Sequence, residues 1–530
     1  MHSTALPTSG RSRIRRSRRS ATALGLAALL TLAACSSDDE TPKAASSSAA
    51  PAASSAASEA APSSAASSEA APSSEAAPSS EAAPASSSAA AEPAPASGER
   101  ATVNWFVGLG TGADQGQPPK QQKVVDAFNA SQNEVTLKMQ IVANVNAPKQ
   151  LATLISGGKS PDLVGPVGIT GANQFEGQWL DLAPLVAKTG FDTSIFAPEA
   201  LKSQTSIDGT QVALPFGVFP SAIFYNKELF DEAEIDYPPA KHGEKYADGS
   251  DWNWDKLREI AKQLTIDAAG KDATDPAFNP EKVVQWGFHT QFAESNMQRG
   301  GTLFGAGSFG NEDKKTAQIP PQWLEAWKFR YDMIWKDKSM PNAKQLASDT
   351  LNKGNAFQTG KVAMATTHLW YTCCIKDSKD KPLTFWDLAA VPNYKGKITA
   401  PLHSDSFRIL KGSKNPDAAF KVLTHFLTTA SAELLGIYGG LPADKNKQQA
   451  FFDNLDKTWT QKPNWPVLQE ALDYPDVPNH ESYTPGYNKT NERSVVLGTK
   501  LVSEGNLDLD AEAAKLQKDL QKIFDENPAN

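Results

Sequence analysis

Cysteine is scarce in this chain of 530 residues: Cys35 and the adjacent pair Cys373 and Cys374 are the only three. No Cys-x-x-Cys, His-x-x-x-His or similar spacing of zinc ligands occurs. The motifs of serine hydrolases and zinc metalloproteases, Gly-x-Ser-x-Gly and His-Glu-x-x-His, are missing too. The sequence therefore predicts no metal site and no cofactor, and it offers no recognisable catalytic motif.

The chain also lacks a long basic run beyond its first residues, and its formal net charge is −8. Loss of the six arginines before position 20, which have no acidic neighbours, would leave a charge of −14. Such a balance makes nucleic acid and anionic lipid poor partners. We expect a monomer that binds a small molecule.

The N-terminus has the layout of an export signal. Arginines at positions 11–19 precede an uncharged apolar run at 21–34, which ends in Leu32, Ala33 and Ala34 before Cys35. The run is shorter than the about 20 residues that a membrane span needs. The segment resembles a bacterial lipobox, which implies that 1–34 are a signal peptide and that Cys35 is acylated. We expect an extracytoplasmic protein held to the cell membrane by palmitate on Cys35. The paired arginines leave general and twin-arginine export open, and we favour the general route.

Residues 36–98 consist almost entirely of Ser, Ala, Pro and Glu, without Leu, Ile, Val or an aromatic residue. The motif Ser-Ser-Glu-Ala-Ala-Pro occurs three times in succession at 67–84. Such a segment buries too little apolar surface to offset its chain entropy. With the acylated Cys35 it predicts a disordered linker over 35–98, whose Ser and Pro content also allows O-glycans.

Residues 101–530 have the composition of a folded protein, and their length exceeds what one core usually supports. We expect strands at 102–107 and 135–139, helices around 123–129 and at 147–156, and a further strand starting near 160–164. This alternation predicts a parallel sheet covered by helices. The turn at 108–112 is rich in glycine but lacks the pattern of a phosphate-binding loop. A ligand-facing loop at a strand end, or a simple turn, is the better interpretation.

Eight segments in a fixed order resemble family 1 of the extracellular solute-binding proteins, which includes maltose-binding protein. They lie at 125–129, 155–163, 179–185, 208–215, 223–230, 357–364, 370 and 390–392. The resemblance implies an α/β fold with two lobes, joined by hinge strands around a central ligand cleft. It puts crossings between the lobes at 214–220, near 402–407 and at 455–463. The first lobe would comprise about 101–215 and 405–455, and the second about 221–400 and 463–530.

The resemblance also implies candidate ligand residues. A sugar-stacking tryptophan follows the Gly-Lys-x-Ala-Met motif in the family, and Trp370 stands there, with His368 as a weaker candidate. Stacking aromatics with carboxylates and amides are what sugar recognition needs. The segment 164–168 carries no aromatic or acidic residue, so we do not expect maltose itself as the ligand. The full set of candidate ligand residues is Trp370, Tyr371, Tyr487, Asp114, Gln117, Phe216, Gly300, Gly301, His403 and Asp405, with Arg299 and Ser404 beside them.

Cys373 and Cys374 lie three and four residues beyond Trp370. Outside the cytoplasm, neighbouring cysteines can form a vicinal disulfide, and free thiols or a bond between molecules are the alternatives.

We expect the substrate-binding component of an ABC importer, which delivers a mono- or oligosaccharide to a membrane permease. Two alternatives remain at this point. An exported glycoside hydrolase would need two carboxylates about 5 to 10 Å apart. A receptor for a polyamine, metal chelate or organic phosphate would need a different set of charges in the cleft.

Overall fold

The computed structural model describes residues 100–528 except 114–115, 207, 376–382 and 384. The predicted signal peptide, the acylation site Cys35 and the linker lie outside the described residues. Among the residues that are described, no helix has the length and apolar character needed to cross a membrane.

One mixed sheet of ten strands organises the described residues. Its order is β2-β1-β3-β9-β4-β7-β6-β5, and β8 and β10 also pair with β4. The strands are β1 (Ala101–Val107), β2 (Val135–Ile141), β3 (Leu163–Gly168), β4 (Leu214–Asn226), β5 (Ile266–Asp267), β6 (Val283–Thr290), β7 (Val362–His368), β8 (Trp386–Ala389), β9 (Leu402–Ile409) and β10 (Leu441–Pro442).

The first lobe is built on β1, β2 and β3, and β1 pairs with both neighbours in parallel. The expected alternation of strands and helices is therefore confirmed in this part. Its helices are α1 (Pro118–Ser131), α2 (Ala147–Ser156), α3 (Ile169–Asn173), α4 (Ala183–Thr189), α5 (Pro198–Lys202), α11 (Pro416–Leu427) and α12 (Ser431–Tyr438). A proline in the first turn of α1, α2 and α4 helps to start each helix. Val124, Val125 and Phe128 of α1 recur at helical spacing and are buried.

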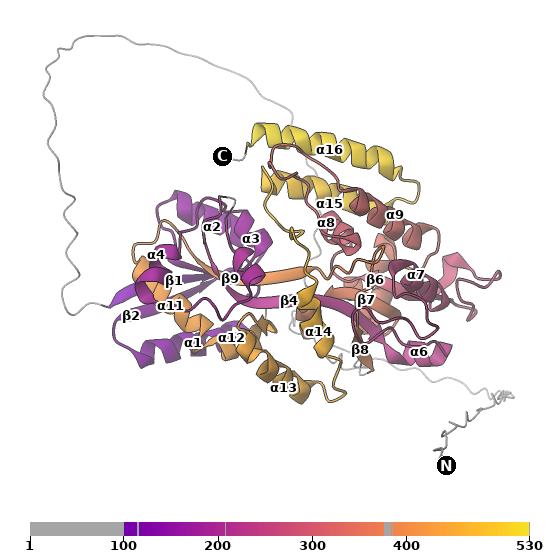
Figure 1. Cartoon of the computed structure of the whole chain (residues 1–530), viewed down its shortest axis with the longest axis horizontal. Coiled ribbons are helices and arrows are strands. Elements are labelled where there is room, and N and C mark those ends of the chain that lie inside the picture. Colours follow the sequence, from indigo (N-terminus) through magenta and orange to yellow (C-terminus); the bar gives the residue numbers. More distant parts are fainter. Residues whose placement is uncertain (1–99, 114–115, 207, 376–382, 384, 529–530) are drawn as a thin grey trace, which may run out of the picture. The chain divides into compact units, whose positions relative to one another are not determined.

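The second lobe is built on β5, β6, β7 and β8. Here β6 and β7 are parallel, whereas β5 pairs with β6 and β8 with β4 in antiparallel fashion. Its helices are α6 (Lys227–Ala233), α7 (Trp254–Gln263), α8 (Met297–Gly301), α9 (Pro321–Trp335), α10 (Ala343–Leu346), α15 (Tyr487–Ser503) and α16 (Leu509–Glu526). In Figure 1, α8, α9, α15 and α16 lie together on one side of the strands of this lobe.

Strands β4 and β9 connect the two lobes and run side by side in Figure 1. All 13 residues of β4 are buried. Residues Leu214 to Pro220 pair with β9, and from Ser221 onward the strand pairs with β7 and β8. The segment at 214–220, for which a hinge and an ordinary loop were both open, is thus a continuous strand at the junction of the lobes.

The chain passes between the lobes again beyond β10, through α13 (Gln448–Thr458) and α14 (Pro466–Glu470). The rings of Trp459 and Trp465 then pack against Trp386 of β8, with centroids 5.1 and 6.0 Å away.

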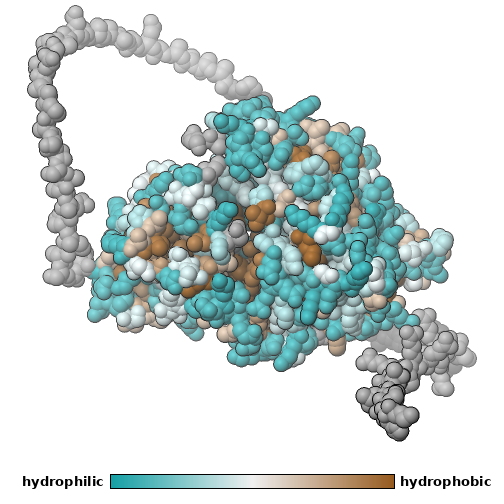
Figure 2. All heavy atoms as spheres, in the orientation of Figure 1, coloured by the Kyte–Doolittle hydropathy of each residue, from teal (hydrophilic) through white to brown (hydrophobic). Residues whose placement is uncertain are grey.

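Most of the tryptophans are buried in the core. Nine of the twelve tryptophans are buried, and Trp335, Trp370 and Trp459 are only partly so. The face of the molecule in Figure 2 is mostly hydrophilic, with hydrophobic residues gathered near its middle. A tryptophan that is only partly buried is the kind of side chain that can contact a ligand.

Candidate functional site

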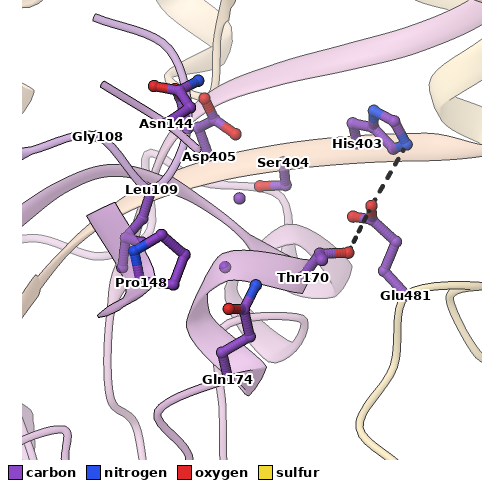
Figure 3. Close-up of a pocket in the computed structure, with 13 residues that line it drawn as sticks. Gly108, Leu109, Asn144, Pro148, Thr170, Gln174, His403, Ser404, Asp405 and Glu481 are labelled. Atoms are coloured by element: carbon purple, nitrogen blue, oxygen red, sulfur yellow. Dashed lines mark hydrogen bonds and ion pairs between the residues drawn. The ribbon is translucent and has the colours of Figure 1, made fainter. Parts of the chain in front are cut away.

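A cavity of about 290 Å³ opens at the carboxyl ends of β1 and β3. Open α/β sheets bind ligands at this edge. Figure 3 shows residues of the first lobe on one side, β9 along the floor and Glu481 opposite α3. The lining residues are Gly108, Leu109, Gly110, Asn144, Pro148, Gly168, Thr170, Gly171, Gln174, His403, Ser404, Asp405 and Glu481.

The first-lobe wall is shaped by glycines that let the turn at 108–112 approach β3 and α3 closely. A Cβ on Gly110 would lie 2.7 Å from the carbonyl oxygen of Pro166, and one on Gly171 would lie 2.5 Å from that of Leu109. Gly108 has a φ of +146°, a conformation that favours glycine. The glycine-rich turn therefore lines a cavity at a strand end, and its role as a ligand-facing loop stays a prediction.

The floor of the cavity is polar because β9 presents His403, Ser404 and Asp405 there. Burial, reinforced by the negative charge of Glu481, raises the pKa of Asp405 to about 7. This carboxyl group can therefore either donate or accept a hydrogen bond near neutral pH. Burial also lowers the pKa of His403 to about 4, although Glu481 acts in the opposite direction. His403 is thus a neutral imidazole at neutral pH.

Glu481 connects the floor to the first lobe. Its Oε1 accepts a 2.9 Å hydrogen bond from the Thr170 hydroxyl and lies 3.7 Å from His403 Nε2. Neither Glu481 nor Thr170 was predicted from the sequence. Glu481 belongs to an irregular segment between α14 and α15, where no periodicity or motif marks a site residue.

An aromatic wall stands beside the floor, at the carboxyl ends of the parallel strands β6 and β7. The Trp370 indole N–H donates to His403 Nδ1 at 3.2 Å, and the two rings are 9° from parallel. Phe292 lies 15° from parallel to Trp370 with its centroid 6.2 Å away, and it is 45% exposed. We call Phe292 and Trp370 the aromatic wall. Its exposed ring surface can stack on the apolar face of a sugar.

Tyr487 reaches the edge of the cavity from the second lobe. It begins α15, is buried, and its hydroxyl donates to Thr170 Oγ1 at 3.1 Å. Thr170 in turn donates to Glu481, so a hydrogen-bonded chain links α15 to α3 beside the cavity.

Four other predicted ligand residues take packing positions. Phe216 is buried against Phe407 and Tyr438, and Tyr371 is buried and donates to Asn355 Oδ1 at 2.6 Å. A Cβ on Gly300 or Gly301 would overlap Arg330 or Trp323, so these glycines let α8 pack against α9.

Gln117 holds the glycine-rich loop from within the first lobe. Its Oε1 accepts from the Gly112 amide at 2.9 Å, and its Nε2 donates to Thr111 Oγ1 at 3.2 Å. It does not line the cavity. Asp114 lies outside the described residues, as does the side chain of Cys373, so the vicinal disulfide stays a prediction.

A second cavity of about 700 Å³ lies between the α5 region and the segment 473–483. None of the ligand residues predicted from the sequence lines it. The smaller cavity is the candidate site because it combines His403 and Asp405 with the carboxyl ends of the strands.

The sequence profile described as bacterial extracellular solute-binding protein matches residues 113–433, which is more than half of the chain. The chain belongs to this family. The matched range includes α2, β3, β9 and Trp370 of the candidate site. A binding protein of Brucella abortus strain 2308 is 27% identical to this solute-binding protein over 346 residues, which cover 64% of this chain and 76% of the relative.

Solved structures show the same fold at low identity. An ABC substrate-binding protein of Listeria monocytogenes in complex with cycloalternan aligns with a TM-score of 0.60 and 20% identity, over 81% of this chain and 99% of that one. The GacH receptor of Streptomyces glaucescens, solved without ligand and with acarbose, aligns with a TM-score of 0.59 and 19% identity, over 81% of this chain and 100% of that one. A cyclic α-maltosyl-1,6-maltose binding protein of Arthrobacter globiformis aligns with a TM-score of 0.60 and 20% identity, over 81% of this chain and 100% of that one. The two-lobe α/β fold is thereby confirmed.

Proposed function

We propose that this solute-binding protein captures a mono- or oligosaccharide and delivers it to the membrane permease of an ABC importer. The observation that carries the proposal is the aromatic wall of Phe292 and Trp370 beside the polar floor of β9. Sugars present an apolar C–H face and a rim of hydroxyls, which match these two surfaces. The carbohydrate ligands of the structural neighbours support the same class of ligand.

Binding by a two-lobe clamp explains how capture is linked to transport. A ligand that contacts both lobes only in the closed form stabilises that form by its difference in affinity. The closed pair of lobe surfaces would then dock on the permease. Strands β4 and β9 run between the lobes and are the natural place for the bending motion.

Calorimetric titration with a panel of mono- and oligosaccharides tests the ligand class. Saturable binding of a sugar, with no product after prolonged incubation, supports the receptor. Mass spectrometry of ligand released from the denatured protein would narrow the panel. Selective binding of polyamines or organic phosphates, without sugar binding, would contradict the proposal.

One observation favours the hydrolase as a second candidate. Asp405 and Glu481 line the same cavity, and the raised pKa of Asp405 gives the two carboxyl groups different environments. Glycosidases use such a pair as acid and base or nucleophile. Product formation that disappears in Asp405→Asn and in Glu481→Gln would establish this alternative, whereas a receptor produces none.

Lipid anchoring at Cys35 completes the proposed function, because a receptor tethered near its permease keeps its ligand close to the membrane. A Cys35→Ser variant should lose membrane association and appear in the soluble extracytoplasmic fraction. Fractionation and immunoblotting measure this. A variant that stays with membranes as firmly as the parent protein would contradict acylation at this residue.

A further inference from the structure

Three histidines that are far apart in the sequence meet beside the hinge. His368 ends β7, His403 lies in β9, and His480 lies in the segment before α15. One ring nitrogen of each lies within 4.8 Å of those of the other two. His368 pairs with Ser221 of β4 and His403 pairs with Phe219. The cluster therefore sits where β4 changes partners between the lobes.

His368 has an unused lone pair on one ring nitrogen. Its side chain is buried, and within the described residues its Nε2 has no hydrogen-bond partner. Its other ring nitrogen faces the carbonyl of Pro401, which fixes the proton there and leaves Nε2 as an acceptor. A buried acceptor without a partner costs free energy, so a further occupant of the cluster would relieve that cost.

His480 is oriented by a buried carboxylate. Its Nδ1–H donates to Asp476 Oδ2 at 2.6 Å, and both side chains are fully buried. Asp476 also accepts from the backbone amides of Leu402 and His480, at 3.0 and 2.9 Å. The Nε2 of His480 therefore carries a lone pair. A carboxylate behind a histidine is the usual support of a metal-ligating imidazole.

His403 completes the set and adds a constraint. Its Nε2 lies 3.3 Å from His480 Nε2, which is about the separation of two nitrogens on a tetrahedral zinc ion. Its ring stacks on His368 at a centroid distance of 3.6 Å. The lone pairs of two stacked rings lie in nearly parallel planes and do not converge on one ion, so ligation by both requires His403 to tilt out of this stack.

The proton of His403 must also move. Its Nδ1 accepts from the Trp370 indole, so its own proton is on Nε2 and points at His480. When Nε2 becomes a metal ligand, that proton passes to Nδ1 and the ring stays neutral. The indole N–H of Trp370 then loses its acceptor.

The charges near the cluster can accommodate a cation. Asp476 and Glu481 contribute two carboxylates, and the buried Arg299 contributes one positive charge that opposes a metal ion. His403 and Glu481 also line the cavity, which gives an ion a path of entry.

We propose that His368, His403 and His480 bind a divalent transition-metal ion of the zinc class. Glu481, whose carboxylate lies 3.7 Å from His403 Nε2, stands outside the three-histidine group and would have to move toward the ion to supply a fourth ligand. Three imidazoles and a carboxylate suit zinc and its neighbours better than calcium or magnesium, which prefer oxygen ligands. This site does not depend on the solute being a sugar.

The test uses the full chain, purified without a polyhistidine tag and stripped of metal with a chelator. Titration with Zn²⁺ should show one ion per chain with a dissociation constant of micromolar order or tighter. Co²⁺ should give the intense visible bands of a tetrahedral site with nitrogen and oxygen ligands. Sulfur-to-cobalt charge-transfer bands would assign the ion to the cysteines and overturn the proposal.

Variants identify the ligands. His368→Asn and His480→Gln should each weaken Zn²⁺ binding by about 100-fold or more, with circular dichroism and melting temperature showing that the fold is intact. His425→Gln is the matched control, because His425 is a partly buried histidine that packs against Phe128, away from the cluster. It should bind one ion with unchanged affinity. If the His368 and His480 variants bind Zn²⁺ as tightly as the parent chain does, the proposal is overturned. It is also overturned if the parent chain shows no saturable Zn²⁺ binding.

The hydrogen bond of Trp370 offers a test of the proton movement. Trp370→Phe keeps an aromatic ring but removes the indole N–H that competes for His403 Nδ1. Its affinity for Zn²⁺ should match that of the parent or exceed it by several-fold. A large loss of affinity would contradict the competition between Trp370 and the ion.

Discussion

The two lobes contribute different kinds of surface to the candidate site, and the rings of the aromatic wall stand beside the cavity rather than in its lining. On the first-lobe side, Gly108, Gly110 and Gly171 let backbone loops approach closely, and few side chains intervene. On the second-lobe side, Phe292 and Trp370 provide rings at the ends of β6 and β7. The first lobe and β9 thus provide most of the cavity lining, whereas the second lobe adds Glu481 and the aromatic rings beside the cavity. Substitutions of the first-lobe glycines should therefore lower the stability of the fold, whereas substitutions of the aromatic wall should lower ligand affinity.

The largest effect on ligand affinity is expected from the aromatic wall. Trp370→Ala should cost roughly 2 to 4 kcal/mol of binding, or about 30- to 1,000-fold in affinity, because a stacked aromatic is lost. Calorimetry with the best sugar of the panel measures this. Trp459→Ala is the control, since Trp459 is also partly buried but packs on Trp386 away from the cavity. A change under about threefold for Trp370→Ala, in a folded protein, would remove the residue from the site.

The first-lobe wall should respond through stability. Gly171→Ala puts a Cβ 2.5 Å from the Leu109 carbonyl oxygen, and the backbone must move to relieve the overlap. We expect a loss of about 1 to 3 kcal/mol in the free energy of unfolding, measured by denaturant titration. Gly436→Ala is the control in α12, because its added Cβ would meet nothing within 4 Å. That control should be neutral or slightly stabilising. If Gly171→Ala and Gly436→Ala have the same stability, the close approach of α3 to the turn at 108–112 does not limit the residue at position 171.

The smallest effect on ligand affinity is expected from the hydrogen bond between Tyr487 of the second lobe and Thr170 of the first. Tyr487→Phe removes the hydroxyl that donates to Thr170, and one hydrogen bond contributes about 0.5 to 1.5 kcal/mol. If this contact forms only in the closed state, ligand affinity should fall by about 2- to 10-fold. Tyr237→Phe removes an exposed hydroxyl that binds Asp231 and should leave the affinity unchanged. An unchanged affinity in Tyr487→Phe would mean that this contact does not contribute to closure.

Local patterns predicted much of the fold. The helix at 147–156 was predicted to the residue, since a proline opens it, glycines follow it and apolar residues recur at helical spacing. The strands of the first lobe followed from alternation and from the position of the glycine-rich turn. Trp370 was predicted from its place after an ordered motif; it is partly buried and contacts His403 beside the cavity, and its role in binding stays a prediction.

Other features depend on contacts between distant segments. Phe216 looked like a cleft residue, but β4 is buried along its whole length, so neither of its faces was marked as the open one. Glu481 and His480 belong to an irregular segment of the chain. His403 lies 77 residues before His480, and His368 lies earlier still. No spacing rule for metal ligands covers such separations. The pairing of β4 with β7 and β9 brings His368 and His403 together, and the hydrogen bond from the Leu402 amide to Asp476 holds the segment with His480 beside them.

The clamp itself can be tested most directly by small-angle X-ray scattering of a chain beginning at Glu99, with and without saturating ligand. We expect a smaller radius of gyration with ligand and an unchanged far-UV circular dichroism spectrum, because the lobes move as rigid bodies about β4 and β9. An unchanged radius of gyration at saturating ligand would contradict the closure of two lobes on a solute.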